Sequence, residues 1–176
     1  MSKSLYIISG PAGVGKSTTS KMLVQTLNKS AYISGDEVSH IPVKGRGKPW
    51  LDKETNDLTW KNISSLTTNL IDYGYDVVVD YVAFPEDIDG LLKELANYDV
   101  RIVYVVLMVD RQTIMYRDSL RAAANQMKER SITLLNEFEN NSNLKEENKL
   151  YTSNYTEEQL PEIVHEIINN DKYRLR

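Results

Sequence analysis

Short, continuously apolar runs alternate along this chain with longer stretches in which apolar residues recur at helical spacing. The strand-like runs are residues 5–9, 31–34, 77–82, 101–109 and 149–152. The helix-like stretches are residues 16–27, 57–73, 86–97, 113–140 and 156–169. The run 101–109 is apolar almost throughout, which is typical of a parallel strand covered on both faces. The alternation predicts an α/β fold, with a five-stranded parallel sheet and helices on both faces.

The breaks between these segments predict how the chain is organised. Two prolines and two glycines mark a loop over 41–52. Thr156 and Gln159 have the spacing of a capping box at the start of the last helix. The stretch 113–140 is long enough that a turn could interrupt it. No internal repeat, low-complexity tract or linker divides the sequence, so we expect one domain over 1–176.

The segment after the first apolar run carries the most specific motif of the chain, Gly10-Pro11-Ala12-Gly13-Val14-Gly15-Lys16-Ser17. Its pattern, G-x-x-x-x-G-K-S, is that of a phosphate-binding P-loop. Glycines let such a loop wrap its backbone N–H groups around phosphates, and the N-terminus of the following helix favours an anion. We reject a dinucleotide-binding fold, because Thr18 stands where that motif needs its third glycine.

The P-loop predicts ATP as a ligand and Mg²⁺ as the accompanying cation. Lys16 can reach the β- and γ-phosphates, and the Ser17 hydroxyl can ligate Mg²⁺. We expect the nucleotide to be bound by Gly10, Ala12, Gly13, Val14, Gly15, Lys16, Ser17 and Thr18.

Three carboxylates lie at or directly after the ends of apolar strand-like runs, at the edge of the sheet where ligands bind in parallel α/β proteins. A sizeable loop follows Asp36, so we assign Asp36 to orienting or deprotonating the acceptor of a phosphoryl group. Asp80 ends the apolar run 77–79, and we assign it to the Mg²⁺ or water side, next to the substrate. Asp110 ends a similar run and is the rival for this role. The alternative for each is a helix N-cap or a turn.

Two segments could cover this edge of the sheet, a substrate loop of about 38–56 and a lid of about 111–140. The loop carries three cationic side chains among glycines and prolines, so it could close over an anionic or polyhydroxy substrate. We assign His40 and Arg46 to that substrate. The alternative is an ordinary solvated loop.

Arginines on the predicted lid supply positive charge. Arg117 and Arg121 lie four residues apart and therefore share one face of a predicted helix, with Arg130 beyond them. Such arginines can neutralise the charge on a transferred phosphoryl group, while the lid excludes water. We expect Arg117 and Arg121 to act in catalysis, with Arg117 also at the nucleotide, and Arg130 at the substrate. The alternative is a solvated face in which the arginines pair with Asp118 and Glu129.

Composition narrows the function classes further. The chain has 176 residues and a net charge of −4, which gives no basic footprint for nucleic acid. It has no cysteine and two histidines, which excludes disulfides and thiolate metal sites. No apolar run approaches 18 residues, so we expect no membrane association and a cytoplasmic location. The oligomeric state stays open.

Over nearly its whole length the chain resembles the small P-loop kinases, a group with nucleoside-monophosphate, shikimate, gluconate and chloramphenicol kinases. The similarity is strongest at the P-loop, at Ser34-Gly35-Asp36 and at Arg117-Asp118-Ser119-Leu120-Arg121. It implies a P-loop NTPase fold with sheet order 2-3-1-4-5, a mobile lid and ATP–Mg²⁺ as phosphoryl donor. It also implies that Asp36 lies on the substrate side and that Thr152, in segment 151–153, lies near the adenine.

Two segments are similar to gluconate kinases in particular. Gly35-Asp36-Glu37-Val38-Ser39-His40 matches their G-D-x-x-x-H pattern, and Lys48-Pro49-Trp50 matches their K-P-W segment. The region 117–139 resembles bacillus-type proteins assigned as gluconate kinases. The chain departs from that pattern at 80–84, where gluconate kinases have S-A-L-K, and it lacks an R-x-x-H-F-like lid motif.

These features predict an ATP-dependent phosphotransferase that moves the γ-phosphate of ATP to a hydroxyl or phosphate of a small molecule, for example a sugar acid such as gluconate. One alternative is an ATP or GTP hydrolase or switch, although no N-K-x-D segment specifies guanine. Another is a nucleotide-binding module without catalysis.

Overall fold

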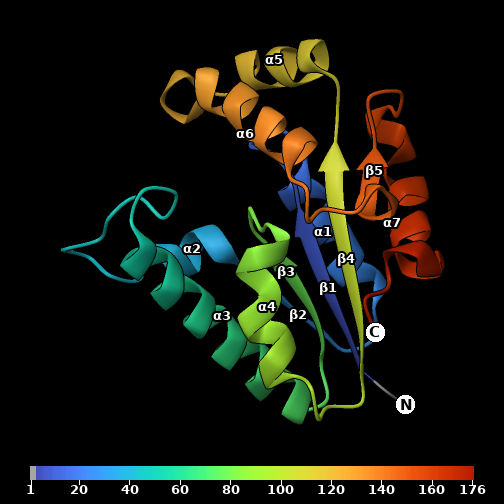
Figure 1. Ribbon diagram of the computed structural model, residues 1–176. Helices are drawn as coiled ribbons and strands as arrows, with labels where there is room; N and C mark the ends of the chain where they lie inside the picture. The colour runs from blue at the N-terminus through green and yellow to red at the C-terminus, as the bar shows by residue number, and fades with distance from the viewer. Residues whose placement is uncertain (1–2) are drawn as a thin grey trace.

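The computed structural model describes residues 3–176, and within them one five-stranded sheet has the order β2-β3-β1-β4-β5 (Figure 1). The strands are β1 (Lys3–Ser9), β2 (Ser30–Ser34), β3 (Asp76–Asp80), β4 (Val100–Met108) and β5 (Lys149–Tyr151). Neighbouring strands of this sheet pair in parallel. The predicted parallel sheet with the order 2-3-1-4-5 is confirmed, and the chain has the P-loop NTPase fold.

Helices cover both faces of the sheet. They are α1 (Lys16–Thr26), α2 (Gly35–Ser39), α3 (Lys53–Asp72), α4 (Pro85–Glu94), α5 (Arg111–Ser119), α6 (Glu129–Asn140) and α7 (Leu160–Asn169). α1 and α7 contact each other on one face, and α3 and α4 contact each other on the opposite face (Figure 1). α5 and α6 lie beyond the carboxyl ends of the strands. Within residues 3–176, no helix combines the length and the apolar character needed to span a bilayer.

The central strands form the core. Leu5, Ile7 and Ile8 of β1 have no exposed surface, and the same holds for the residues Val77–Val79 of β3. Burying each such side chain contributes about 1.5–3 kcal/mol, so the near-continuous apolar runs seen in the sequence place these strands at the centre. The carboxyl ends of these strands are thereby joined directly to the buried core of the molecule.

The register of the strands aligns their carboxyl ends. Ile8 of β1 lies opposite Asp80 of β3, and Asp80 lies opposite Ser34 of β2. The residues that follow β1 and β2, together with Asp80 itself, therefore meet at one edge of the sheet.

Several boundaries differ from the sequence prediction. α3 begins four residues earlier than expected, because the Asp52 side chain accepts a hydrogen bond from the backbone N–H of Thr55 and caps the helix. The short helix α2 was not predicted. The stretch 113–140 is interrupted between α5 and α6, where a 3-10 turn, η1 (Ala123–Asn125), is found. The capping box at 156–159 is confirmed, although it opens a 3-10 turn, η3 (Glu157–Gln159), directly before α7.

Candidate active site

The P-loop adopts a conformation that needs its glycines. Gly10, Gly13 and Gly15 have φ values of 137°, 85° and 104°. A Cβ atom on Gly10 would lie 2.4 Å from the carbonyl oxygen of Leu107 in β4, so a larger residue does not fit there. α1 then begins at Lys16. Its N-cap residue is Gly15, which has no side chain to accept a hydrogen bond from the first turn of the helix. Its first backbone N–H groups are thus available to an anion.

Lys16 is partly buried and lies against the loop. Its Nζ donates hydrogen bonds to the carbonyl oxygens of Gly10 and Pro11, both at 3.0 Å. Burial lowers the pKa of Lys16, whereas the carboxylates of Asp80 and then Asp36 favour its charged form. The structure therefore brings the predicted donor-side lysine and both predicted carboxylates into one electrostatic neighbourhood.

Asp80 belongs to a polar cluster beside α1. Its carboxylate is nearly buried and accepts a hydrogen bond of 2.7 Å from the hydroxyl of Tyr32. The pKa of Tyr32 is raised mainly by burial and, to a smaller extent, by the hydrogen bond and the charge of Asp80. Hydrogen bonds with the hydroxyls of Ser17 and Ser34 act in the opposite direction. The structure thus places Ser17 and Asp80, the two predicted metal ligands, around one tyrosine.

Tyr32 was missed by the sequence analysis, although a signal for it exists. Tyr32 and Ser34 are two residues apart in β2, and side chains at that spacing point to the same face of a sheet. Because Ser34 lies opposite Asp80, the hydroxyl of Tyr32 can reach that carboxylate from the neighbouring strand.

The predicted magnesium site has a donor set that suits this ion. Mg²⁺ prefers oxygen ligands, and proteins hold it with one or two carboxylates, the phosphates of the substrate and water. The Ser17 hydroxyl and the Asp80 carboxylate supply such oxygens at the N-terminus of α1. Within residues 3–176 no group of three or more His, Cys, Asp or Glu side chains could hold a metal without help from a nucleotide.

Asp36 lies on the first turn of α2, directly after β2. The helix starts there because the Ser34 side chain caps it by accepting the Glu37 N–H. Gly35 is required by close packing, since its Cβ would lie 2.2 Å from Cγ of Tyr81. Burial and then Asp36 raise the pKa of Tyr81 to about 12. Tyr81 was not predicted as a site residue, and no pattern in the sequence indicates that its ring packs against Gly35.

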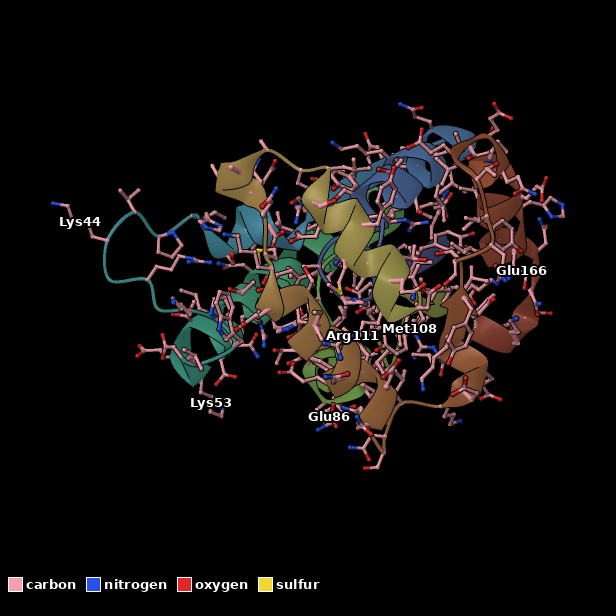
Figure 2. All side chains as sticks on the ribbon, turned by 90° about the horizontal axis from the view of Figure 1, so that it is seen from above. Lys44, Lys53, Glu86, Met108, Arg111 and Glu166 are labelled. Atoms are coloured by element: carbon pink, nitrogen blue, oxygen red, sulfur yellow. The ribbon has the colours of Figure 1, made fainter. Side chains whose placement is uncertain are left out.

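A cleft of about 240 Å³ lies between α2, α3 and the loop that joins them. Its lining includes Ser39, Arg46 and Thr55. Arg46 donates from Nε to the carbonyl oxygen of Ser39 at 2.6 Å and from Nη2 to the Ser39 hydroxyl at 3.0 Å. Lys44, at the tip of the loop, extends away from the body of the protein (Figure 2). Lys44 and Arg46 both contribute to the lining of the cleft, and of the two Arg46 is the one held in place by hydrogen bonds to Ser39 of α2.

His40 has a different position from the one expected. It ends α2, and its Nδ1 lies 2.6 Å from the carbonyl oxygen of Asp36 in the same helix. The ring contacts the backbone of its own helix, and the residues of α2 that line the cleft are Val38 and Ser39, with neither His40 nor Asp36 among them. Its assignment to the substrate stays a prediction.

The lid contacts the P-loop directly. Arg117, on α5, donates a hydrogen bond from Nη1 to the carbonyl oxygen of Val14 at 2.9 Å. Arg121 does not share a helix face with Arg117, which corrects the sequence prediction. α5 ends at Ser119, because side chains of Asp118 and Gln126 bond to the backbone of the turn that follows.

Arg130 connects the lid to the substrate loop. It lies on α6, where its Nη1 is 3.0 Å from Glu137 Oε1, and its guanidinium carbon is 5.2 Å from the ring centre of Trp50. This is the geometry of a cation–π contact. The structure thus brings Arg130 to Trp50 of the substrate loop. Its assignment to the substrate stays a prediction.

The two remaining predicted residues lie at the ends of β4 and β5. Asp110 caps α5 by accepting hydrogen bonds from the N–H and hydroxyl of Thr113, and these bonds and Ser153 lower its pKa to about 2. Asp110 therefore has the capping role considered as its alternative. Thr152 is buried, its N–H donates to Met108, and its hydroxyl has no hydrogen-bond partner within the described residues. Its assignment to the adenine stays a prediction.

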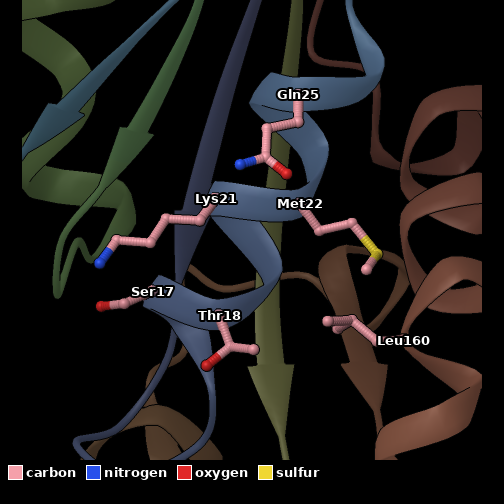
Figure 3. Close-up of a pocket in the computed structure, with 6 residues that line it drawn as sticks. All are labelled: Ser17, Thr18, Lys21, Met22, Gln25 and Leu160. Atoms are coloured by element: carbon pink, nitrogen blue, oxygen red, sulfur yellow. The ribbon is translucent and has the colours of Figure 1, made fainter.

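A second hollow, of about 330 Å³, lies on the outer face of α1 beside α7. The residues that line it are Ser17, Thr18, Lys21, Met22, Gln25 and Leu160. In Figure 3 the side chains of Ser17 and Lys21 extend to one side of α1, and Met22 extends toward Leu160 on the other. It adjoins the P-loop only through Ser17 and Thr18, so it is separate from the acceptor-side cleft.

Comparison with known proteins agrees with this geometry. Residues 5–139 match the family model described as AAA domain, AAA_33. No curated protein matches the chain. The structure is similar to a gluconokinase from Sinorhizobium meliloti 1021, with 19% identity over 94% of this chain and 89% of that chain and a TM-score of 0.64. It is also similar to the Mycobacterium tuberculosis APS kinase CysC, with 20% identity over 93% and 96% and a TM-score of 0.64.

A third similar structure is a Deinococcus radiodurans tunicamycin resistance protein, with 16% identity over 96% of both chains and a TM-score of 0.63. At such identities the similarity shows the fold alone, and the chemistry must be argued from the site. The family match, in contrast, spans most of the chain. This protein therefore belongs to the AAA domain family AAA_33, with the fold of the P-loop kinases.

Proposed function

We propose that this protein is an ATP-dependent phosphotransferase that phosphorylates a hydroxyl group of a small molecule. The observation that carries the proposal is the shared neighbourhood of Lys16, Asp80 and Asp36 at the carboxyl edge of the sheet. The charges of both carboxylates act on Lys16, and the register of the strands brings the two carboxylates to one edge, because Asp80 lies opposite Ser34 and Asp36 follows two residues later. A phosphoryl donor and an acceptor need such an arrangement on opposite sides of the transferred group.

Each residue has a definite task in this reaction. The N–H groups of the P-loop and the start of α1 bind the phosphates, and Lys16 balances their charge. Bound Mg²⁺, held by Ser17 and Asp80, would neutralise charge on the β- and γ-phosphates. Asp36 accepts the proton of the acceptor hydroxyl as its oxygen bonds to the γ-phosphorus, and the bond to ADP breaks. Arg117 and Arg121 stabilise the charge on the phosphoryl group.

The acceptor side favours a small polar molecule. The cleft of about 240 Å³ is smaller than the pockets of roughly 300–1,000 Å³ that hold drug-sized ligands. Its polar lining combines the hydroxyl groups of Ser39 and Thr55, the cations Lys44 and Arg46, and the carboxylates of Asp52 and Glu54. Such a mixed polar lining suits a small molecule with several hydroxyl groups, and we propose a sugar acid such as gluconate, with Arg46 as the partner of its carboxylate, as the first candidate acceptor.

The test is Mg²⁺-dependent ADP release from ATP across sugar acids, sugars, nucleosides, nucleoside monophosphates and aminoglycosides. We expect turnover with one acceptor class and a loss of about 100-fold or more in Asp36→Asn, because a positioned general base contributes that much. Glu37→Gln is the matched control, since it removes the neighbouring exposed carboxylate of the same helix. ADP release that needs no acceptor and is unchanged in Asp36→Asn would replace this proposal with a hydrolase.

A further inference from the structure

Asp118 is a buried carboxylate that ties the two lid helices together. It lies on the last turn of α5, with 7% of its side chain exposed. Its Oδ1 accepts a hydrogen bond from the N–H of Met127 at 2.9 Å, and its Oδ2 accepts one from Lys128 at 2.7 Å. α6 begins at the next residue, so a side chain from α5 caps the N-terminus of α6.

The turn between the helices is ordered by further contacts. Gln126 donates from Nε2 to the carbonyl oxygens of Ser119 and Arg121, at 3.3 and 3.0 Å. Lys128 has a φ of 46°, and it is the one non-glycine residue with positive φ in the described part of the chain. Side chains rarely adopt this conformation, so it persists only where surrounding contacts impose it. The carboxylate of Asp118 supplies the contact at that residue.

Asp118 also holds Arg121. Arg121 Nη1 is 3.6 Å from Asp118 Oδ1, and 41% of the Arg121 side chain is exposed. Burial opposes the charge of Asp118, but the two N–H donors and Arg121 outweigh it and lower the pKa of the carboxyl. The charge of Arg121 in turn contributes to lowering the pKa of Lys16. Arg121 follows directly after α5, and α5 contacts the P-loop through the hydrogen bond of Arg117 to Val14, so the turn that carries Arg121 lies next to the phosphate loop.

We propose that Asp118 is a positioning residue: it fixes the lid turn so that Arg121 points at the place of the transferred phosphoryl group. This inference rests on the proposed function, because it gives Arg121 a task in phosphoryl transfer. Without Asp118, the turn would lose the carboxylate that joins α5 to the backbone at the start of α6, and Arg121 would lose its ion-pair partner.

The experiment compares the affinity for Mg·ADP alone with that for Mg·ADP plus aluminium fluoride, which mimics the phosphoryl group in transfer. It needs no acceptor, so it is independent of the acceptor panel. We expect fluoride to tighten binding in the wild type and Asp118→Asn to lose about tenfold or more of that tightening. Affinity for Mg·ADP alone should stay within twofold. Glu129→Gln is the matched control, because it removes a carboxylate at the same end of α6 without touching an arginine.

The double variant separates positioning from simple stability. If Asp118 acts through Arg121, then Arg121→Gln loses the tightening to the same extent and adding Asp118→Asn costs nothing more. Additive losses, an equal loss in Glu129→Gln, or no tightening in the wild type would overturn the proposal. If an acceptor panel finds no substrate while the tightening follows this pattern, the proposed function fails and the positioning role stands.

A second measurement covers the case in which Asp118→Asn does not fold. Hydrogen exchange of the backbone amides over 119–128 is followed in the wild type and in Arg121→Gln, with Mg·ADP and with Mg·ADP plus aluminium fluoride. We expect fluoride to slow exchange across this turn in the wild type only. If fluoride slows exchange equally in the wild type and in Arg121→Gln, Arg121 does not connect the turn to the phosphoryl group. Asp118 would then only cap α6, which contradicts the proposal.

Discussion

The donor and acceptor sides of this site are built in opposite ways. On the donor side, Val14 of the P-loop is 2% exposed, and Gly10 packs against the backbone of β4. On the acceptor side, Val43 and Leu51 of the substrate loop are 92% and 77% exposed. The donor side is fixed by backbone contacts with the core, whereas side chains from separate segments hold the acceptor side together.

This difference explains why the sequence predicts the ligand of the donor side but not the ligand of the acceptor side. A phosphate is bound by backbone N–H groups and one lysine, so a short contiguous motif is enough to encode its site. An acceptor is recognised by side chains that converge from different elements, here α2, α3, the substrate loop and the lid. Those residues are scattered along the sequence and form no contiguous motif, and therefore the chemistry of the donor is clear while the acceptor has to be found by experiment.

We expect the largest effect when a glycine on each side is replaced by alanine and the free energies of unfolding are compared. In Gly10→Ala the new Cβ would meet the Leu107 carbonyl oxygen at 2.4 Å in a backbone conformation that side chains rarely adopt. We expect a loss of about 2–4 kcal/mol in the free energy of unfolding, measured by urea denaturation. Gly45→Ala also has a positive φ, of 78°, but meets nothing within 4 Å, and should cost about 1 kcal/mol. Equal losses would contradict the contrast between a packed and an open side.

An intermediate effect is expected at the contact between the lid and the substrate loop. Trp50→Leu removes the ring that faces Arg130, and an exposed cation–π contact contributes about 0.5–1 kcal/mol. We expect KM for the acceptor to rise about two- to fivefold, measured by initial rates, with KM for ATP unchanged. Leu51→Ala is the control, because it truncates the exposed neighbour and leaves the ring of Trp50 in place. A rise in KM for ATP of the same size would show that the two sides are not separate.

The smallest effect concerns the cap of α5, the helix that carries Arg117 to the P-loop. Asp110 has a pKa of about 2 in the folded protein against an ordinary value of 3.8. Its charged form thus stabilises the fold above about pH 4, and this contribution is lost as the pH falls toward 2. Wild type should have the higher Tm at pH 7, and its advantage over Asp110→Asn should vanish near pH 2. A difference that is constant with pH would mean that the carboxylate charge is not what stabilises the cap.

The lid shows where prediction from sequence stopped. The spacing of Arg117 and Arg121 predicted that both lie on one face of the same helix, and Arg117 does lie on α5 against the P-loop. The chain leaves the helix before Arg121 because Asp118 and Gln126 bond to the backbone of the following turn. Periodicity reports which residues share a helix face, but it does not report a side chain that returns to cap the next helix.

The sequence by itself determined how strands and helices alternate along the chain. It also determined the P-loop and the positions of Asp36 and Asp80 at the ends of their strands. These features follow from local rules, since apolar runs must be buried and a phosphate loop needs its glycines in a fixed spacing. Only the tertiary structure decided that Tyr32 binds Asp80, that Tyr81 packs under Gly35 and that Asp118 spans two helices. Each of these contacts joins residues from different elements, and their meeting depends on strand register and helix packing, which no local pattern encodes.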